Sequence, residues 1–407
     1  MRWIMPLMLT GLWALATTPD SRAQDVEHLA RTFETEFSAA LDEEAVPGGA
    51  FAVVHRGRVL RVGTFGHLDN QRSRAVTPET VFRVASVSKG FAATAAAMLA
   101  AEGAFEWAEP ITRYRPDFPD RRSSRPITVS DVIGQTTGYI PHAYDNLIEA
   151  GKPLDEIYRR FGELEPVCNP GACYTYQNGA FALIEPVLEQ ASGHDLPTLL
   201  RERLFAPLGM ATASVGFDSF KATENRASPH VRARSSWHRV PVNGNYYAVN
   251  SAAGVNASIL DMATWVNAML GHHPEVLSTE VIDTVTTPRV ATPRNLNHRY
   301  WRDHLHNAHY GKGWRVYQLG QQELVYHGGW VSGFRADAGF APAHDLGLVM
   351  LLNAESSLIS ELSASFWSRA LDETRLARRQ ADSKAGSAAG GADAGLAPAP
   401  QVQVQPE

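Results

Sequence analysis

The chain has 407 residues, of which 44% are hydrophobic and 20% charged, ordinary values for a globular protein with a large core. Its formal net charge of −6 is small for this length, which argues against nucleic acid or an anionic membrane surface as the main partner. Beyond the N-terminus no stretch approaches the roughly 20 apolar residues of a membrane span, so we expect no stable membrane span.

The first 23 residues have the pattern of a secretory signal peptide. Met1-Arg2 supplies a positive start, residues 3–16 form an apolar run, and Ser21-Arg22-Ala23 carries the small residues that signal peptidase prefers. We therefore expect cleavage before Gln24 and a periplasmic or secreted protein.

Hydrophobic periodicity predicts an α+β chain in which a hairpin and the late strands form one sheet, flanked by the first and last helices. Between them lies a helical subdomain within about residues 86–207. The predicted elements, in chain order, are a helix at 25–44, strands at 50–54, 59–63 and 80–85, a helix from 90 to 102, mostly helices to 207, loops and strand-like segments over 214–256, a helix at 258–270, strands at 313–319, 323–326, 334–340 and 347–352, and a helix at 358–375.

The C-terminal segment differs in composition from the rest. Residues 381–407 consist mainly of Ala, Gly, Pro, Gln and Ser without an apolar period, so they bury too little surface to offset the entropy of ordering. We expect a disordered tail, which leaves residues 24–380 as the folded domain.

The two cysteines, Cys168 and Cys173, flank a Pro170-Gly171 turn. In an exported protein such a close pair predicts a disulfide. The loop that it closes is short, so we expect a modest effect on stability and a role in stiffening the approach to Tyr176. Two thiols without paired histidines nearby do not favour a zinc site.

Ser86 and Lys89 are the first candidate catalytic pair. They follow a strand-like run and open an alanine-rich helix, and side chains three positions apart on a helix lie on one face. Unpaired N–H groups at the helix start favour an oxyanion and a neutral lysine, and such a lysine can take the proton of the serine hydroxyl. The alternative is that Ser86 caps the helix while Lys89 lies on its solvated face.

Tyr176 and Asn178 form the second candidate motif, on a loop before a helix. A tyrosine relays a proton if a nearby lysine stabilises its phenolate, and an asparagine two residues on can donate its amide to a substrate carbonyl. The alternative is a packed tyrosine and a turn asparagine.

The third candidate motif is His327-Gly328-Gly329-Trp330, on a strand. Two glycines in a strand often mark the close approach of backbone or ligand, and here they predict an edge to which an extended substrate can pair. His327 can donate a hydrogen bond or a charge to that substrate. The alternative is a bulge with a packed histidine.

Together the three motifs resemble the penicillin-recognising serine hydrolases, in particular the class C β-lactamase-like branch, which carries Ser-x-x-Lys, Tyr-x-Asn and Lys/His-Thr/Gly-Gly in this order. The resemblance covers about residues 33–371. Further matching segments are Ala45-Val46-Pro47-Gly48, Ile127-Thr128-Val129, Thr136-Thr137-Gly138, Phe205-Ala206-Pro207-Leu208-Gly209-Met210, Asp261-Met262-Ala263, Tyr310-Gly311-Lys312-Gly313-Trp314 and Leu346-Gly347-Leu348-Val349-Met350-Leu351-Leu352-Asn353.

The resemblance implies a β-lactamase/transpeptidase-like fold and an acyl-enzyme on Ser86, with Lys89 and Tyr176 sharing its proton and no metal or organic cofactor. It implies that Asn178 holds the substrate amide and that His327, at the position where many relatives carry lysine, belongs to the substrate-binding site. It also implies that Trp330, which follows Gly329, contributes its backbone N–H with that of Ser86 to an oxyanion hole.

The histidine of the third motif is a departure from true class C β-lactamases, which carry lysine there to hold the substrate carboxylate. A His-x-Gly motif resembles D,D-peptidases, D-amino-acid peptidases and esterases of the same branch. The expected substrates are therefore β-lactams, D-amino-acid peptides or esters.

Three other classes of protein fit the sequence less well. An α/β-hydrolase needs a Gly-x-Ser-x-Gly elbow, which the chain lacks. A metal enzyme would have to use the histidines of a polar loop without an acidic ligand at helical spacing. A binding protein that captures β-lactams or cell-wall fragments without turnover would not need all three motifs. The histidines of that loop are His298, His304, His306 and His309.

Overall fold

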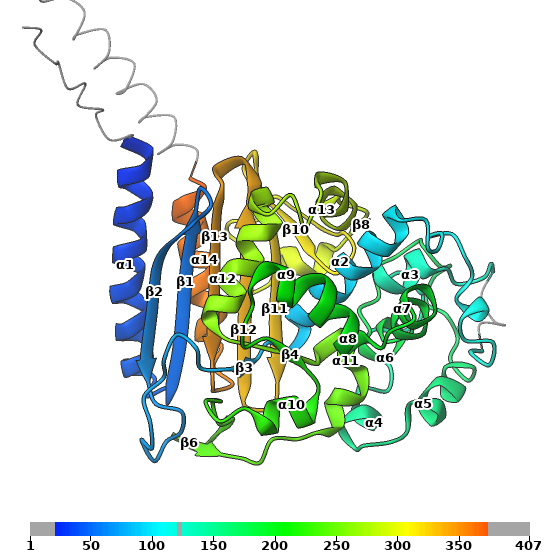
Figure 1. Ribbon diagram of the computed structural model, residues 1–407, viewed down its shortest axis with the longest axis horizontal. Helices are drawn as coiled ribbons and strands as arrows, with labels where there is room; N and C mark the ends of the chain where they lie inside the picture. The colour runs from blue at the N-terminus through cyan, green and yellow to red at the C-terminus, as the bar shows by residue number, and fades with distance from the viewer. Residues whose placement is uncertain (1–20, 120–123, 373–407) are drawn as a thin grey trace, which may run out of the picture.

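The computed structural model describes residues 21–119 and 124–372 (Figure 1). Its strands are β1 (Gly48–His55), β2 (Arg58–Gly66), β3 (Phe82–Arg83), β4 (Ser214–Val215), β5 (His230–Ala233), β6 (Ser236–Arg239), β7 (Val255–Ala257), β8 (Val290–Ala291), β9 (Asn307–Tyr310), β10 (Arg315–Leu319), β11 (Gln322–Val331), β12 (Phe334–Ala341) and β13 (Leu346–Leu352).

The helices cover both faces of the strands and form the helical subdomain. They are α1 (Ser21–Glu43), α2 (Ser88–Ala101), α3 (Val129–Ile133), α4 (Asp145–Glu149), α5 (Leu154–Phe161), α6 (Asn178–Phe181), α7 (Ile184–Ser192), α8 (Leu196–Leu200), α9 (Ala206–Leu208), α10 (Phe217–Ala222), α11 (Asn250–Ala253), α12 (Ile259–Asn267), α13 (Thr279–Thr286) and α14 (Leu358–Ala370).

One antiparallel sheet organises the fold, with the strand order β2-β1-β13-β12-β11-β10-β9-β8. The N-terminal hairpin and the late strands therefore form one sheet, as the sequence predicts, with β1 paired to β13, the last of the described strands. Smaller sheets join β3, β7 and β4, and β5 with β6. The helical subdomain of α3 to α8 lies beyond the β10 side of the main sheet in Figure 1, which confirms the expected α+β architecture.

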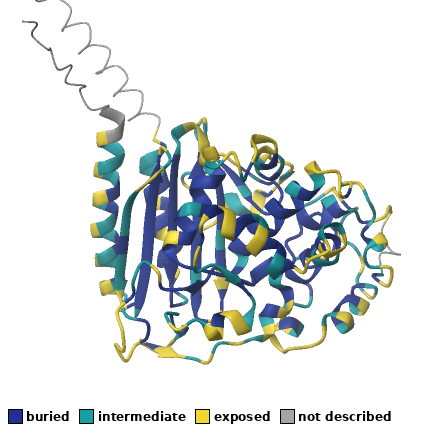
Figure 2. Ribbon diagram, viewed as in Figure 1, coloured by how far each residue is buried: buried dark blue, intermediate teal, exposed yellow. Residues whose placement is uncertain are grey.

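Two apolar cores lie on opposite faces of the main sheet. On one face, Phe33 and Phe37 of α1 pack on Phe51 of β1, and Phe366 of α14 packs on Phe33, with ring centroids 5.2–6.0 Å apart. The second core joins the other face to α2, α12 and the helical subdomain. Figure 2 shows α1 buried on its sheet side and exposed outside, the consequence of its amphipathic pattern.

Three sequence predictions of secondary structure need correction. The strand expected at 80–85 is only β3, because Ala85 takes a left-handed conformation (φ 50°) and the chain turns there into a 3-10 turn at Ala85–Val87. The segment 214–256 contains two helices, α10 and α11, too short to show a clear apolar period. The last helix ends at Ala370 instead of near residue 375.

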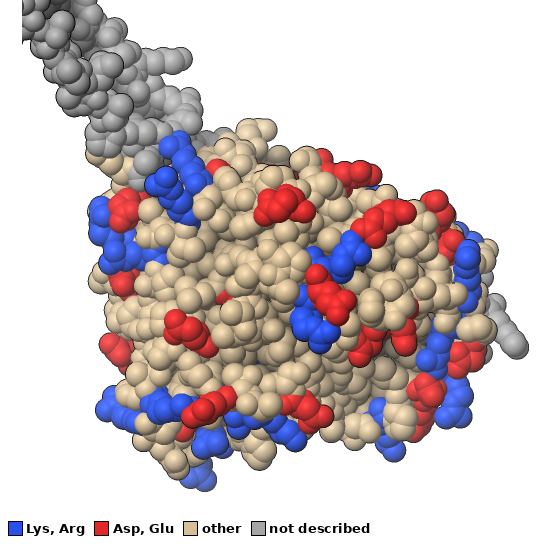
Figure 3. All heavy atoms as spheres, viewed as in Figure 1, with Lys and Arg blue, Asp and Glu red and all other residues tan. Residues whose placement is uncertain are grey.

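Two predictions concern residues outside the described part of the chain. Of the predicted signal peptide at 1–23, residues 1–20 are not described, and residues 21–23 open α1; the predicted tail at 381–407 is not described either. None of the described helices is long and apolar enough to cross a membrane. On the face shown in Figure 3, acidic and basic side chains are interspersed.

Candidate active site

Ser86 stands at a sharp turn between β3 and α2. The left-handed Ala85 precedes it, a conformation that costs a non-glycine residue about 1–3 kcal/mol and persists where the surroundings enforce it. Ser86 is partly exposed while its neighbours on both sides are buried, and it lines a large cavity. The turn thus presents the hydroxyl to the cavity and does not use it as a cap of α2.

Lys89 lies beside Ser86 and is completely buried. Its Nζ is 3.3 Å from Ser86 Oγ, 2.7 Å from Asn178 Oδ1 and 3.0 Å from the carbonyl oxygen of Ala252 in α11. Burial lowers the pKa of Lys89 well below its ordinary value, and the charge of Arg315 lowers this pKa further. The sequence prediction that serine and lysine touch is confirmed.

The three neighbours of Nζ fix where the lone pair of a neutral amine points. A neutral amine has two N–H donors and one lone pair, and the oxygens of Asn178 and Ala252 can only accept hydrogen bonds. The two donors therefore go to these two oxygens at the shorter distances. The lone pair is left facing Ser86 Oγ, the one neighbour with a proton to give.

Tyr176 also lies next to Ser86. Its hydroxyl lies within hydrogen-bonding reach of Ser86, and its ring centroid is 4.7 Å from Lys89 Nζ. Burial raises the pKa of Tyr176, and the positive charge of Arg315 offsets only part of this effect. The phenol is therefore protonated at neutral pH, so it is suited to donate a proton and not to act as a phenolate.

Asn178 holds Lys89 and lines the cavity. Its Oδ1 accepts from Lys89, while its Nδ2 donates to Asp145 Oδ2 at 2.9 Å and to the Tyr246 hydroxyl at 2.7 Å. Both amide hydrogens are thus engaged within the protein. The expected bond from this amide to a substrate carbonyl requires one of these two bonds to be exchanged.

His327 is buried and does not lie among the residues that line the cavity. Its Nδ1 lies 2.8 Å from the Gly328 carbonyl oxygen, which can only accept, so Nδ1 carries the proton. Arg315 Nη1 lies 3.4 Å from Nδ1 and 3.3 Å from Nε2. Burial, with the charges of Arg315 and Lys89, holds the pKa of His327 well below its ordinary value. The prediction that His327 offers a charge to the substrate is therefore corrected: it is a neutral support for Arg315.

Arg315 is a cation that lines the cavity near Tyr176, and the sequence analysis did not identify it. It begins β10, lines the cavity, and its Cζ lies 5.4 Å from the ring centroid of Tyr176. Among the described residues no carboxylate forms an ion pair with it. Tyrosines surround it instead: Tyr174, Tyr176, Tyr310 and Tyr317.

Gly329 brings β11 against the nucleophile turn. A Cβ atom there would lie 2.2 Å from the Val84 carbonyl oxygen and 3.2 Å from the Cβ of Ala85, closer than atoms can pack. The strand next to Ser86 therefore needs glycine at this position, which confirms the predicted close approach of backbone. The contribution of the Trp330 N–H to an oxyanion hole remains a prediction.

Replacing Gly329 by alanine is expected to destabilise the protein by about 1–3 kcal/mol, because backbone atoms of the nucleophile turn must move. Thermal or urea unfolding measures the loss. Gly328→Ala is the matched control, since its Cβ would meet only the Tyr326 hydroxyl, at 3.1 Å. Equal destabilisation by both variants would contradict the close contact at Gly329.

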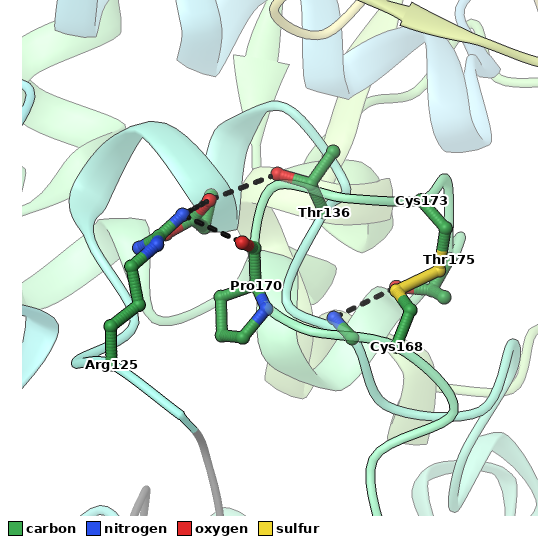
Figure 4. Close-up of a disulfide and its surroundings, with 8 residues drawn as sticks. Arg125, Thr136, Cys168, Pro170, Cys173 and Thr175 are labelled. Carbon is green, nitrogen blue, oxygen red and sulfur yellow. Dashed lines mark hydrogen bonds and ion pairs between the residues drawn. A yellow bond between two sulfur atoms is a disulfide. The ribbon is translucent and has the colours of Figure 1, made fainter.

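The disulfide of Cys168 and Cys173 is present, with the two Cα atoms 6.2 Å apart (Figure 4). Arg125 donates to the Pro170 carbonyl oxygen at 2.9 Å within this loop and pairs with Asp131 at 2.7 Å. Cys173 lies on the cavity wall, three residues before Tyr176. The bridge is thus placed where the sequence predicts a stiff approach to Tyr176.

The cavity that these residues line has a volume of about 1290 Å³. Besides Arg315, the structure adds Asp145, which bonds Asn178 and also lines it. Within residues 21–119 and 124–372 no group of three or more His, Cys, Asp or Glu side chains is placed to hold a metal ion. The histidines that the sequence suggested as ligands form no such group.

The sheet, the helical subdomain and the buried lysine beside a serine at the start of α2 define the β-lactamase/transpeptidase-like class of protein. The chain belongs to the Beta-lactamase family, whose model matches residues 33–363.

Known proteins similar to this chain agree with that assignment. It is 27% identical to a D-aminopeptidase of Brucella anthropi over 76% of this chain and 56% of the relative, and 25% identical to an unguisins hydrolase of Aspergillus campestris over 80% and 61%. The chain therefore spans less than two thirds of these relatives. An octameric penicillin-binding protein homologue from Pyrococcus abyssi shares the fold, with a TM-score of 0.74, 22% identity, and coverage of 84% of this chain and 77% of that one.

Proposed function

We propose that the protein is an exported serine hydrolase that cleaves amide or ester bonds through an acyl-enzyme on Ser86. The observation that carries this proposal is the hydrogen bonding of Lys89, which leaves an amine lone pair facing Ser86 Oγ at 3.3 Å. The similarity to a D-aminopeptidase supports D-amino-acid peptides as one substrate class, and the predicted signal peptide supports a periplasmic or secreted enzyme.

The geometry supports one order of proton transfers. Lys89 Nζ accepts the Ser86 proton as Oγ bonds to the substrate carbonyl carbon, and the backbone N–H groups of Ser86 and Trp330 bind the oxyanion. The protonated Tyr176 phenol lies next to Oγ and donates to the departing amine or alkoxide; Lys89 then restores its proton. Water then attacks the acyl group while the same proton transfers run in reverse. This step releases the acid and regenerates Ser86.

Arg315 supports a substrate with an anionic group. Arg315 is half-buried at the cavity wall and forms no ion pair with a carboxylate among the described residues, so a bound carboxylate would give it an ionic partner. The Arg315 guanidinium would supply the positive charge that lysine provides in the third motif of class C β-lactamases. The C-terminal carboxylate of a D-peptide and the carboxylate of a β-lactam both have this chemistry.

A substrate panel tests the function. p-Nitrophenyl esters, D-alanyl-D-alanine peptides and the β-lactam nitrocefin separate an esterase, a peptidase and a β-lactamase. A fluorescent penicillin adds a second readout: rapid turnover indicates a β-lactamase, and a stable adduct without hydrolysis of any substrate indicates a binding protein. The absence of both adduct and hydrolysis would contradict the proposed function.

Arg315→Met is expected to lower kcat/KM for a D-peptide with a free carboxylate by about 30-fold or more, since the loss of one partner of a buried charge pair costs about 2 kcal/mol or more. The same peptide with an amidated C-terminus is the control substrate and should lose far less. Arg315→Lys, which keeps the charge, should fall between wild type and Arg315→Met. An equal loss on both peptides would show that Arg315 only supports the fold.

A further inference from the structure

Trp330 is an exposed indole that the structure holds in one orientation. With 63% of its surface exposed, it is the most exposed large apolar side chain among the described residues. Its Nε1 donates to Glu355 Oε2 at 3.0 Å, and the Arg335 guanidinium packs 5.1 Å from its ring centroid. Glu355 is itself fixed by the Gly333 N–H at 2.7 Å. A rigid, exposed aromatic ring is typical of a binding surface.

The cavity that holds Ser86 also reaches Trp330, around the edge of β11. β10 pairs with β11 only as far as Tyr326, so among the described strands the segment from His327 to Val331 pairs with β12 alone. The cavity is lined by Ser86 and Tyr176 on one face of the sheet. On the α14 face it is lined by Tyr326, Trp330 and Arg335.

An extended substrate that pairs with this open edge must place its substituents alternately on the two faces of the sheet. His327 and Gly329 point to the face of Ser86, as the contact of Gly329 with Val84 shows, whereas Trp330 points to the α14 face. Substituents that the substrate carries next to the scissile carbonyl, on the α14 face of the sheet, are therefore directed toward the indole.

Arg335 packs against the indole and also reaches the hydroxyl of Ser360, with Nη2 3.4 Å from Oγ. Burial lowers the pKa of Arg335, and the nearby carboxylates of Asp337 and Glu355 offset only part of this effect. The exposed indole is the large apolar surface that this part of the cavity offers to a substrate.

We propose that Trp330 forms a subsite for an aromatic group of the substrate, on the α14 face of the sheet. The proposal rests on the proposed function, because it assigns the substrate of the same nucleophile. Stacking on the indole selects substrates that carry an aromatic ring next to the bond that is cleaved.

Four thioesters test the subsite: the acyl group is propionyl or 3-phenylpropionyl, and the thiol is ethanethiol or phenylmethanethiol. Both cysteines of the chain are in the disulfide, so the released thiol can be measured directly. If the indole contacts the acyl group, wild type should have the higher kcat/KM for the two 3-phenylpropionyl thioesters. If it contacts the leaving group, wild type should have the higher kcat/KM for the two thioesters of phenylmethanethiol. Trp330→Ala should reduce that ring selectivity about tenfold, in line with stacking energies near 1.4 kcal/mol, and Trp330→Phe should keep it within about threefold.

The outcomes separate this proposal from the proposed function. Leu260→Ala, at an exposed apolar position of α12 outside the cavity, is the control and should change neither rate nor selectivity. Unchanged selectivity in Trp330→Ala would overturn the subsite while leaving the hydrolase intact. If wild type hydrolyses none of the thioesters, fluorescence titration of Ser86→Ala protein with 3-phenylpropionate decides: saturable quenching that Trp330→Ala abolishes supports the subsite, and no quenching overturns it.

Discussion

Replacing Ser86 by alanine is expected to lower kcat on every substrate by about 10⁵-fold or more. Loss of the nucleophile in a coupled catalytic group has a cost of about 10⁶-fold, because the remaining members have no bond to form. Here the Lys89 amine and the Tyr176 phenol both converge on one hydroxyl oxygen. Steady-state kinetics on the substrate panel measures the loss. Mass spectrometry of the intact protein after treatment with a fluorophosphonate gives a second readout, because the reagent should add its mass only to protein that contains Ser86.

Ser88 supplies the matched control for this prediction. It lies two residues further along α2 and is buried away from the cavity, where its Oγ accepts from the Val255 N–H at 2.9 Å. Ser88→Ala loses one hydrogen bond, worth about 1 kcal/mol of stability, and should keep both hydrolysis and the fluorophosphonate adduct. Hydrolysis that survives in Ser86→Ala would refute the assignment of the nucleophile.

Local sequence was enough to predict much of the fold and the contact between Ser86 and Lys89. Apolar runs predicted β1 and β13, which are buried on both faces of the sheet, and a period of 3.6 residues predicted α1, which buries one face (Figure 2). The spacing of Ser86 and Lys89 predicted their contact because three residues span about one helical turn. The short separation of Cys168 and Cys173 predicted the disulfide because a short loop keeps the two thiols close together.

What the sequence could not predict depends on contacts between distant segments. Arg315 and Asp145 are ordinary charged residues in the sequence, and only the fold brings them to the cavity. The Ala252 carbonyl that orients Lys89 belongs to α11, a helix of one turn within a segment that lacked a helical pattern. His327 matched the motif, but its burial beside Arg315 decided its charge. Motifs therefore identified the candidate groups, whereas the tertiary structure sets the direction in which their pKa values shift.

Replacing Lys89 by methionine is expected to lower kcat by about 10³-fold or more, since a positioned general base contributes roughly 10²–10⁴-fold and the oxyanion then forms without it. In wild type, activity should be present at neutral pH and fall as the pH drops through the lowered pKa of Lys89. Asp145→Asn should shift this acid limb to lower pH, because the Asp145 carboxylate favours the charged amine. A pH–rate profile of each protein measures the limb, and no shift would contradict the coupling.

The same lysine makes the stability of the protein depend on pH, independently of activity. Its pKa is lowered on folding, so between that value and about 10.4 the unfolded chain binds more protons and the free energy of unfolding rises with pH, by up to about 1.4 kcal/mol per pH unit. Lys89→Met lacks the group, so the stability of wild type relative to this variant should increase with pH across that window in urea unfolding. A difference that does not vary with pH would mean that the amine is charged when folded. A charged amine has no lone pair to take the Ser86 proton, and the proposed mechanism would then fail at its first step.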